Sequence, residues 1–185
     1  MREQEDIPAD LSELIRLGTI ASVDLNARRC TVRYGAADDD DAGGATTPSI
    51  RWLAPRCGKT RVWSPPSVGE QVILLCPDGQ LAAAIALPGI EQDAFPLPAS
   101  GLAELVEYED GARIGYDPQL HALTAILPGG GTARIEAPGG MTIQGDVTVE
   151  GKITATGDVT GQGVSLKNHV HSGVSAGGAK TGAPE

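Results

Sequence analysis

Two histidines near the carboxyl end of the sequence, His169 and His171, have the residue type and the spacing of a metal-binding pair. On an extended backbone, side chains two residues apart point to the same side, so both imidazoles can face one ion. A single chain supplies two nitrogens, fewer than the four that a closed zinc site requires. Three chains around a threefold axis would supply two each, six in all. Such an octahedron suits iron better than nickel, cobalt or tetrahedral zinc.

The alternative is that this His-x-His pair lies in a flexible, glycine-rich tail and binds nothing. Its place directly after a periodic segment favours the metal site, because a narrow tip with little hydrophobic core gains from a metal that holds its chains together. Alternation carried forward from the periodic segment puts Lys167 on the same face as the histidines. We therefore expect a change of register within residues 161–167. The third histidine, His121, lies alone in a predicted strand and is interpreted as structural.

The segment that leads to the histidines, residues 139–168, repeats every six residues. Its blocks are GGMTIQ, GDVTVE, GKITAT, GDVTGQ and GVSLKN, with glycine at the first place of each. Apolar residues occupy the third and fifth places of the first three blocks, which is the two-residue period of a strand with one buried face. Each block therefore predicts about three residues of strand followed by a bend, a unit too short to be stable unless it stacks on others.

Two arrangements can stack such repeats. In the left-handed β-helix of hexapeptide-repeat acyltransferases, an aliphatic residue precedes each glycine, whereas Gln144, Glu150, Thr156 and Gln162 precede them here. Five blocks would also make fewer than two coils of that helix, too few to bury a core. We therefore expect an intertwined trimer, in which three chains wind about one axis and small apolar residues fill a narrow three-sided prism.

Two groups of strands, separated by a linker, are predicted ahead of the repeats. Apolar alternation interrupted by turn residues predicts about five strands over residues 18–90, the pattern of a small antiparallel barrel such as an OB-fold. Residues 1–17 are expected to form an amino-terminal segment with a short helix, and residues 91–101 a proline-containing linker. Three more strands begin residues 102–163, the predicted shaft, and residues 164–185 form the apex. The expected fold is all-β: an OB-fold barrel, then a trimeric triple-stranded β-helix with a metal-bound apex.

Composition limits the partners. The net charge of −10 disfavours nucleic acid and anionic membrane surfaces as electrostatic partners. Aromatic residues make up only 3% of the chain, so little apolar area is buried per residue and stability is expected to come from repetition or association of chains. Cys30, Cys57 and Cys76 show no metal-ligand spacing and are interpreted as reduced, mostly buried thiols. The first residues lack the apolar segment of a signal peptide, which predicts cytoplasmic synthesis without Sec export.

Together these segments resemble phage baseplate assembly protein V, the central spike of contractile phage tails and R-type pyocins. In the amino-terminal part the resemblance rests on GTI at 18–20, WL at 52–53, WSPP at 63–66, VGEQV at 68–72 and LPG at 87–89. In the carboxyl-terminal part it rests on GDVT at 145–148 and at 157–160, and on SLKNHVHSGV at 165–174.

The resemblance implies a homotrimer with an OB-fold collar, a triple-stranded β-helix and a pointed apex, where His169 and His171 of three subunits hold one iron ion. It allows calcium or chloride in the apex too, although no residue here matches to place either. It implies a spike at the tip of a virion or pyocin tail baseplate, made in the bacterial cytoplasm and in contact with hub and tube proteins. Such a spike pierces the outer membrane of the target bacterium when the sheath contracts.

The sequence has no HExxH motif and no carboxylate pair in a catalytic context, so an enzyme is not expected. Two other hypotheses remain: a hexapeptide-repeat acyltransferase and a trimeric fibre that binds a receptor. The acyltransferase would need more coils and a histidine at a coil interface. Fibres usually display aromatic or loop-rich tips, unlike this small and polar one.

Overall fold

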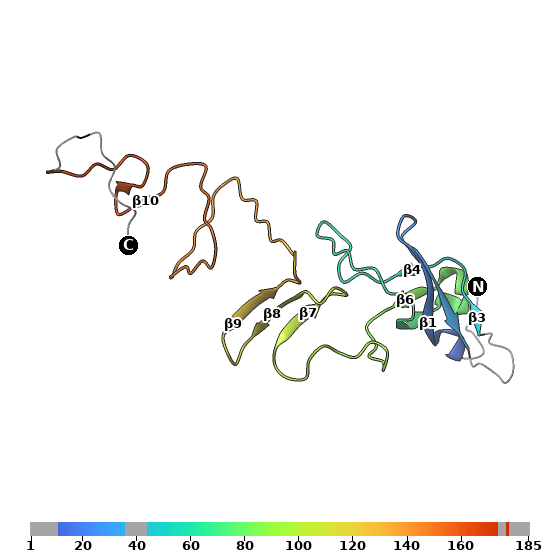
Figure 1. Cartoon of the computed structure of the whole chain (residues 1–185). Coiled ribbons are helices and arrows are strands. Elements are labelled where there is room, and N and C mark those ends of the chain that lie inside the picture. Colours follow the sequence, from blue (N-terminus) through green and yellow to red (C-terminus); the bar gives the residue numbers. More distant parts are fainter. Residues whose placement is uncertain (1–10, 36–43, 174–176, 178–185) are drawn as a thin grey trace, which may run out of the picture. The chain divides into compact units, whose positions relative to one another are not determined.

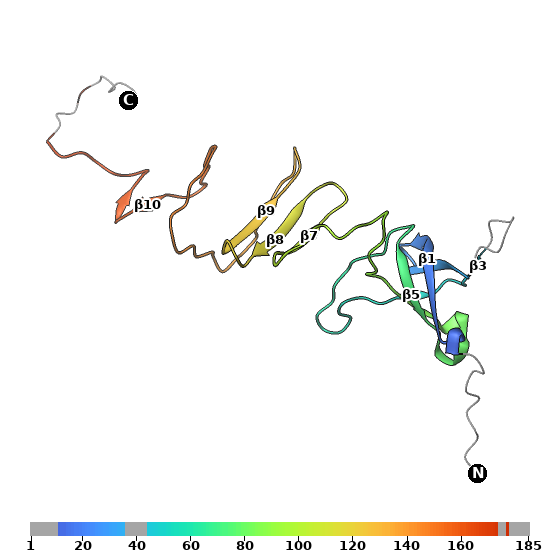
Figure 2. The same ribbon diagram turned by 90° about the horizontal axis from the view of Figure 1, so that it is seen from below.

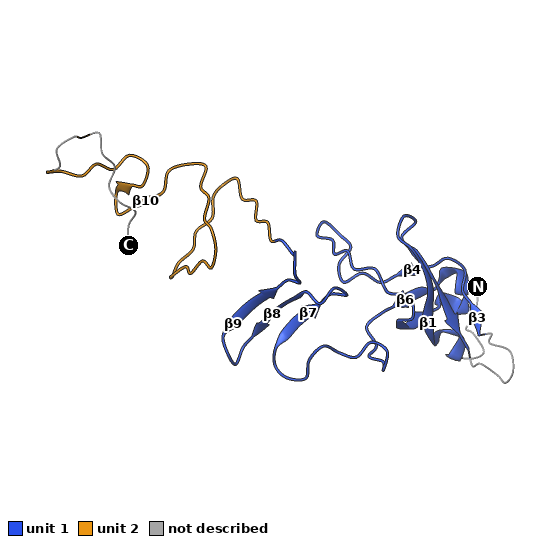
Figure 3. Cartoon of the chain, viewed as in Figure 1, with its two compact units in different colours: residues 1–132 blue, residues 133–185 orange. Residues whose placement is uncertain are grey.

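The computed structural model describes residues 11–35, 44–173 and 177 (Figure 1). The chain divides into two compact units. The first unit comprises residues 1–132 and the second residues 133–185 (Figure 3). Within the described ranges the regular elements are β-strands and short 3-10 turns, with no α-helix. The all-β prediction is therefore confirmed. No helix in this described part is long and apolar enough to cross a membrane.

The first unit contains a six-stranded sheet in the order β3-β2-β1-β5-β6-β4. Its strands are β1 (Ile15–Asp24), β2 (Arg29–Tyr34), β3 (Ala45–Thr46), β4 (Arg51–Trp52), β5 (Gln71–Leu75) and β6 (Ile85–Leu87). Three 3-10 turns accompany them: η1 (Leu11–Glu13), η2 (Pro77–Gly79) and η3 (Leu81–Ala83). Strand β1 pairs with both β2 and β5, and Figure 2 shows β1 and β5 side by side. All pairings are antiparallel except that of β4 with β6.

This sheet curls back on itself. The backbone of Cys30 in β2 exchanges two hydrogen bonds, of 3.0 and 2.9 Å, with that of Ile50 just before β4. The register of β1 against β2 shifts between Ile20 and Ser22, a bulge of the kind that lets a long strand bend around a small barrel. Gly18 lies close against β2, because a Cβ there would stand 2.5 Å from the Val32 side chain. The bridge between Cys30 and Ile50 joins β2, next to one end of the sheet order, to the segment just before β4 at the other end, and so closes a small barrel.

Alternate residues of the barrel strands form its core, as expected when successive side chains point to opposite faces. The core consists of Ile20, Cys30, Val32, Ile50, Val72, Leu74, Cys76, Ala84 and Ala86. Two of the three free cysteines are buried there, and burial raises the pKa of both thiols, Cys30 and Cys76. Cys57 is exposed instead. The strands predicted for residues 18–90 are present, although β1 begins at Ile15.

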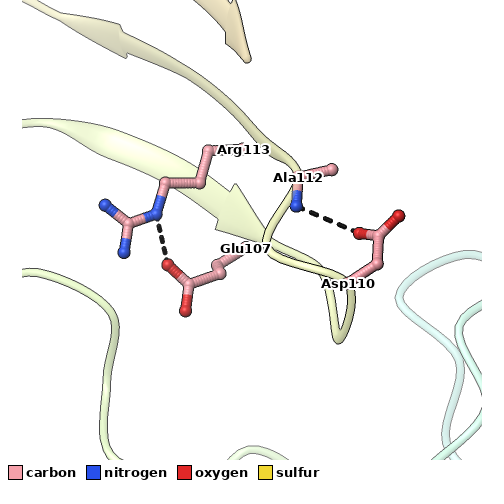
Figure 4. A network of polar contacts seen from close by, with 4 residues as sticks. All are labelled: Glu107, Asp110, Ala112 and Arg113. Atoms are coloured by element: carbon pink, nitrogen blue, oxygen red, sulfur yellow. Dashed lines mark hydrogen bonds and ion pairs between the residues drawn. The ribbon is translucent and has the colours of Figure 1, made fainter. Parts of the chain in front are cut away.

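A separate three-stranded antiparallel meander follows, formed by β7 (Glu104–Glu107), β8 (Arg113–Asp117) and β9 (Ala122–Ile126). An ion pair between Glu107 and Arg113 joins β7 to β8, and the Asp110 carboxylate accepts a hydrogen bond from the N–H of Ala112 (Figure 4). Ala112 is the one buried apolar residue of this segment among the described residues. The meander therefore has almost no core of its own.

The structure corrects the strand expected around His121, and it describes only part of the expected amino-terminal segment. His121 lies in the turn before β9 with φ of 52°, not in a strand; the apolar residues around it suggested a strand, but the chain reverses there. The helix expected within residues 1–17 falls largely outside the described residues, as does most of the apex segment after Gly173. Of that first segment the structure describes residues 11–17, which contain the turn η1 and the start of β1.

The six-residue repeats form no strand ladder within the chain over described residues 133–159. Their apolar side chains at the third and fifth places remain 47–75% exposed; these are Met141, Ile143, Val147, Val149 and Ile153. A strand without a neighbour has backbone N–H and C=O groups without a strand partner, and its apolar face is exposed to water. Coils stacked within one chain, which the acyltransferase hypothesis requires, are absent from these described residues.

Candidate metal centre

A tight hairpin precedes the two histidines. It consists of β10 (Thr160–Gly161) and β11 (Val164–Ser165), which are antiparallel. The two residues between them, Gln162 and Gly163, have positive φ values of 49° and 83°, as the two-residue turns that suit hairpins require. A register change was expected within residues 161–167 without a definite form. In the structure the chain reverses direction there.

Asp158 holds the two arms of this hairpin together. Its Oδ1 accepts a hydrogen bond of 3.0 Å from the backbone N–H of Lys167, nine residues later. The Ser165 hydroxyl, that N–H and the N–H of Val159 together hold the pKa of Asp158 below its usual value, and the hydroxyl has the largest effect. Leu166 adds a backbone bond of 2.8 Å to the Val159 carbonyl. The segment that leads to the histidines is therefore fixed to the end of the repeats.

Ser165 then starts a turn that places the first histidine. Its Oγ accepts the N–H of Asn168 at 2.8 Å, and its carbonyl accepts the N–H of His169 at 3.1 Å. Because this turn interrupts the extended backbone, the alternation that put Lys167 on the histidine face does not continue through it. The prediction that Lys167 points to the same side as the histidines assumed a continuous extended backbone, and that assumption does not hold here.

The ring of His169 is oriented by backbone carbonyls. Its Nδ1 lies 3.1 Å from the carbonyl oxygen of Ser165 and 3.2 Å from that of Leu166. Carbonyl oxygens only accept hydrogen bonds, so in the neutral ring Nδ1 carries the proton and Nε2 keeps its lone pair. A metal-binding histidine usually has this arrangement, in which the distal N–H is held and the other nitrogen faces the ion.

The second histidine lies against the first. The ring centroids of His169 and His171 are 5.1 Å apart, with an angle of 79° between the ring planes. Both side chains are exposed. Among the described residues, no group of three or more His, Cys, Asp or Glu side chains within one chain could hold a metal ion. The pair therefore supplies two ligands, and a complete site on these residues needs ligands from elsewhere.

Sequence patterns identified the histidines but missed Asp158 and Ser165. Asp158 occupies the same place in its GDVT block as Asp146 does two blocks earlier, so the repeat gave no reason to distinguish the two. The available signal was the following Gly-Gln-Gly, since a short polar side chain just before a tight turn often bonds to the backbone beyond it.

Comparison with known proteins covers both ends of the chain. Residues 16–90 match the family described as the type VI secretion system/phage-baseplate injector OB domain, and residues 163–185 match the GpV apex motif. The apex motif includes both histidines, and the predicted OB-fold is confirmed. The spike protein of Escherichia phage P2 is 39% identical over 139 residues, which are 75% of this chain and 61% of that protein. The match thus spans less than two thirds of that relative's length.

Proposed function

This chain belongs to the phage baseplate assembly protein V family, and on that premise we propose that it is the non-enzymatic spike at the tip of a contractile tail. The observation that carries the proposal is the joint presence of an injector OB domain at residues 16–90 and an apex motif at residues 163–185 in one chain. The 39% sequence identity to the spike protein of phage P2 supports the same role.

The spike is a homotrimer in which the repeats of three chains form one shaft. Support comes from the apolar third and fifth places of the repeats, which stay largely exposed in a single chain. Burying a Val or Ile side chain stabilises a structure by roughly 1.5–3 kcal/mol, so covering five such positions per chain is a large driving force for association. Pairing with neighbouring chains also satisfies backbone groups that have no strand partner within the described part of one chain.

The apex binds one iron ion through His169 and His171 of all three chains. Each chain offers an Nε2 with a free lone pair on His169 and a second imidazole beside it. Six imidazole nitrogens suit octahedral iron better than tetrahedral zinc. The ion supplies a structural cross-link at the narrow end of the trimer, where few apolar side chains are available.

Mechanical work follows from this assembly. The OB collar docks to the hub and tube proteins of the baseplate, and sheath contraction drives the shaft, apex first, through the outer membrane of the target bacterium. A rigid shaft and a metal-bound tip transmit force without chemistry. The competing acyltransferase hypothesis requires coils stacked within one chain, which described residues 133–159 do not form.

The mass of the purified protein tests the trimer directly. One chain has a mass of 19.0 kDa, so three chains give about 57 kDa (3 × 19.0). We expect light scattering coupled to size-exclusion chromatography to report that mass across the whole peak at micromolar concentration. A mass of one chain under these conditions would exclude an intertwined shaft.

A further inference from the structure

A concave surface of about 540 Å³ on the OB domain gathers cationic and aromatic side chains. Trp52 and Trp63 lie in it with their ring centroids 5.8 Å apart, and Trp63 is 57% exposed. Five arginines line the same surface: Arg28, Arg29, Arg51, Arg56 and Arg61. We call this surface the arginine–tryptophan pocket. Exposed aromatic and guanidinium groups gathered in one hollow are typical of protein interaction sites.

The positive charge of this pocket is not neutralised by ion pairs within the described part of the chain. None of the five arginines forms an ion pair with any described residue. Residues 44–66, which supply Arg51, Arg56 and Arg61, contain no Asp or Glu at all. Yet the whole chain has 24 acidic and 14 basic residues. A concentrated positive surface on an acidic chain is best matched by carboxylates, because nucleic acid would be repelled by the rest of the molecule.

The β7–β8 hairpin has the complementary chemistry. Residues 104–117 contain five carboxylates and one arginine, a net charge of −4 (−5 + 1). The Glu107 carboxylate forms an ion pair with Arg113, and the Asp110 carboxylate accepts a hydrogen bond from the N–H of Ala112 (Figure 4). Glu109, at the tip, has no hydrogen bond or ion pair with any described residue. Tyr108 beside it is 52% exposed, so the tip offers a free carboxylate next to an aromatic ring.

The hairpin also buries little apolar surface. Ala112 is the one buried apolar residue of the described meander, while Val106, Ile114 and Tyr116 stay exposed. We propose that in the trimer the arginine–tryptophan pocket of each subunit takes the tip of the β7–β8 hairpin of the next subunit. This inference rests on the trimer proposed above. A head-to-tail contact repeated around a threefold axis closes after three copies, so all three pockets and all three tips are used.

Cys57 makes this contact testable, because it is exposed and lines the pocket while the other two cysteines are buried in the core. A disulfide requires Cβ atoms about 3.5–4.5 Å apart, so it forms only where the tip reaches the pocket. Glu109→Cys and Asp110→Cys place a partner thiol on either side of the tip. Diamide then accepts two electrons and two protons as each S–S bond forms. The products are separated on a non-reducing denaturing gel.

We expect at least one of these variants to give covalent dimers and closed trimers that a reducing agent returns to single chains. The same variant with Cys57→Ser should stay a single chain, as should Glu150→Cys, a control that keeps Cys57 and moves the new thiol into the repeats. Single chains from both tip variants, or a disulfide closed within one chain, would overturn the docking. Light scattering on the same samples separates the two proposals: a trimeric mass without cross-links rejects the contact alone, and a single-chain mass rejects the trimer as well.

Discussion

The Asp158 carboxylate accepts the backbone N–H of Lys167 at 3.0 Å, across a hairpin whose turn is only two residues long. Through this bond the last complete repeat is tied to the segment from which His169 and His171 project. Ser165 belongs to the same unit, since its hydroxyl bonds to Asp158 and its carbonyl faces Nδ1 of His169. One carboxylate therefore helps to position the segment that carries the proposed ligands.

Removal of this carboxylate should loosen metal binding. We expect Asp158→Ala to weaken metal retention by about 10-fold or more, the usual effect of losing a group that orients a ligand. Competition with a chelator measures the change. Asp146→Ala is the matched control, because Asp146 has the same place in an identical GDVT block and no hydrogen bond or ion pair with any described residue. Equal metal loss from both variants would show that Asp158 has no special role.

The hairpin should weaken in acid by a process separate from metal release. The hydrogen bonds of Asp158 lower its pKa below the ordinary 3.8, so the ionised form is favoured in the folded hairpin. Its stabilisation is complete above the unfolded pKa and is lost as the pH falls through the lower folded pKa. In the metal-free double variant His169→Ala/His171→Ala, we expect the Lys167 amide resonance to shift below about pH 4. Asp158→Asn in that background should abolish the shift, and an unchanged titration would contradict the assignment.

Turn chemistry provides a third check. Gln162 and Gly163 both have positive φ, a conformation that asparagine followed by glycine adopts most readily. Gln162→Asn should therefore slow hydrogen exchange of the Leu166 amide, which bonds to Val159 across the hairpin. Gly163→Val should speed it, since a β-branched residue at this φ costs roughly 1 kcal/mol or more. Faster exchange in Gln162→Asn together with slower exchange in Gly163→Val would exclude this turn.

Gly18 is a position in the barrel where a larger side chain should destabilise the fold. A Cβ at Gly18 would lie 2.5 Å from Cγ1 of Val32 and 2.7 Å from the Arg33 carbonyl oxygen. We expect Gly18→Ala to lower the free energy of unfolding by about 1–3 kcal/mol, the usual cost of overpacking. Gly58→Ala serves as control, because nothing lies within 4 Å of the corresponding Cβ. Urea unfolding followed by tryptophan fluorescence compares the two, and equal midpoints would contradict the close approach.

Features encoded by neighbouring residues could be predicted from the sequence. Alternation of apolar residues located the strands of the barrel and of the meander, and a two-residue spacing identified His169 and His171. The reversal at Gln162 was foreseen only as a register change, because an extended backbone was assumed up to the histidines. His121 was misplaced for the same reason: apolar residues on both sides suggested a continuous strand.

Features that join distant segments could not be predicted in this way. Asp158 meets Lys167 only after the hairpin forms. The arginine–tryptophan pocket combines Arg28 and Arg29 with side chains more than twenty residues later, so no local pattern marked it. The shaft depends on contacts between chains. Alternation of apolar residues predicts that such contacts form, but it does not predict which residues of neighbouring chains lie opposite each other.

Metal content tests the central claim most directly. Protein purified without a histidine tag should contain one iron per three chains by elemental mass spectrometry, at a mass of about 57 kDa (3 × 19.0). The variant His169→Ala/His171→Ala should contain no iron and keep the trimeric mass. Wild-type trimers without metal, or a double variant that retains its iron, would contradict a spike closed by these two histidines.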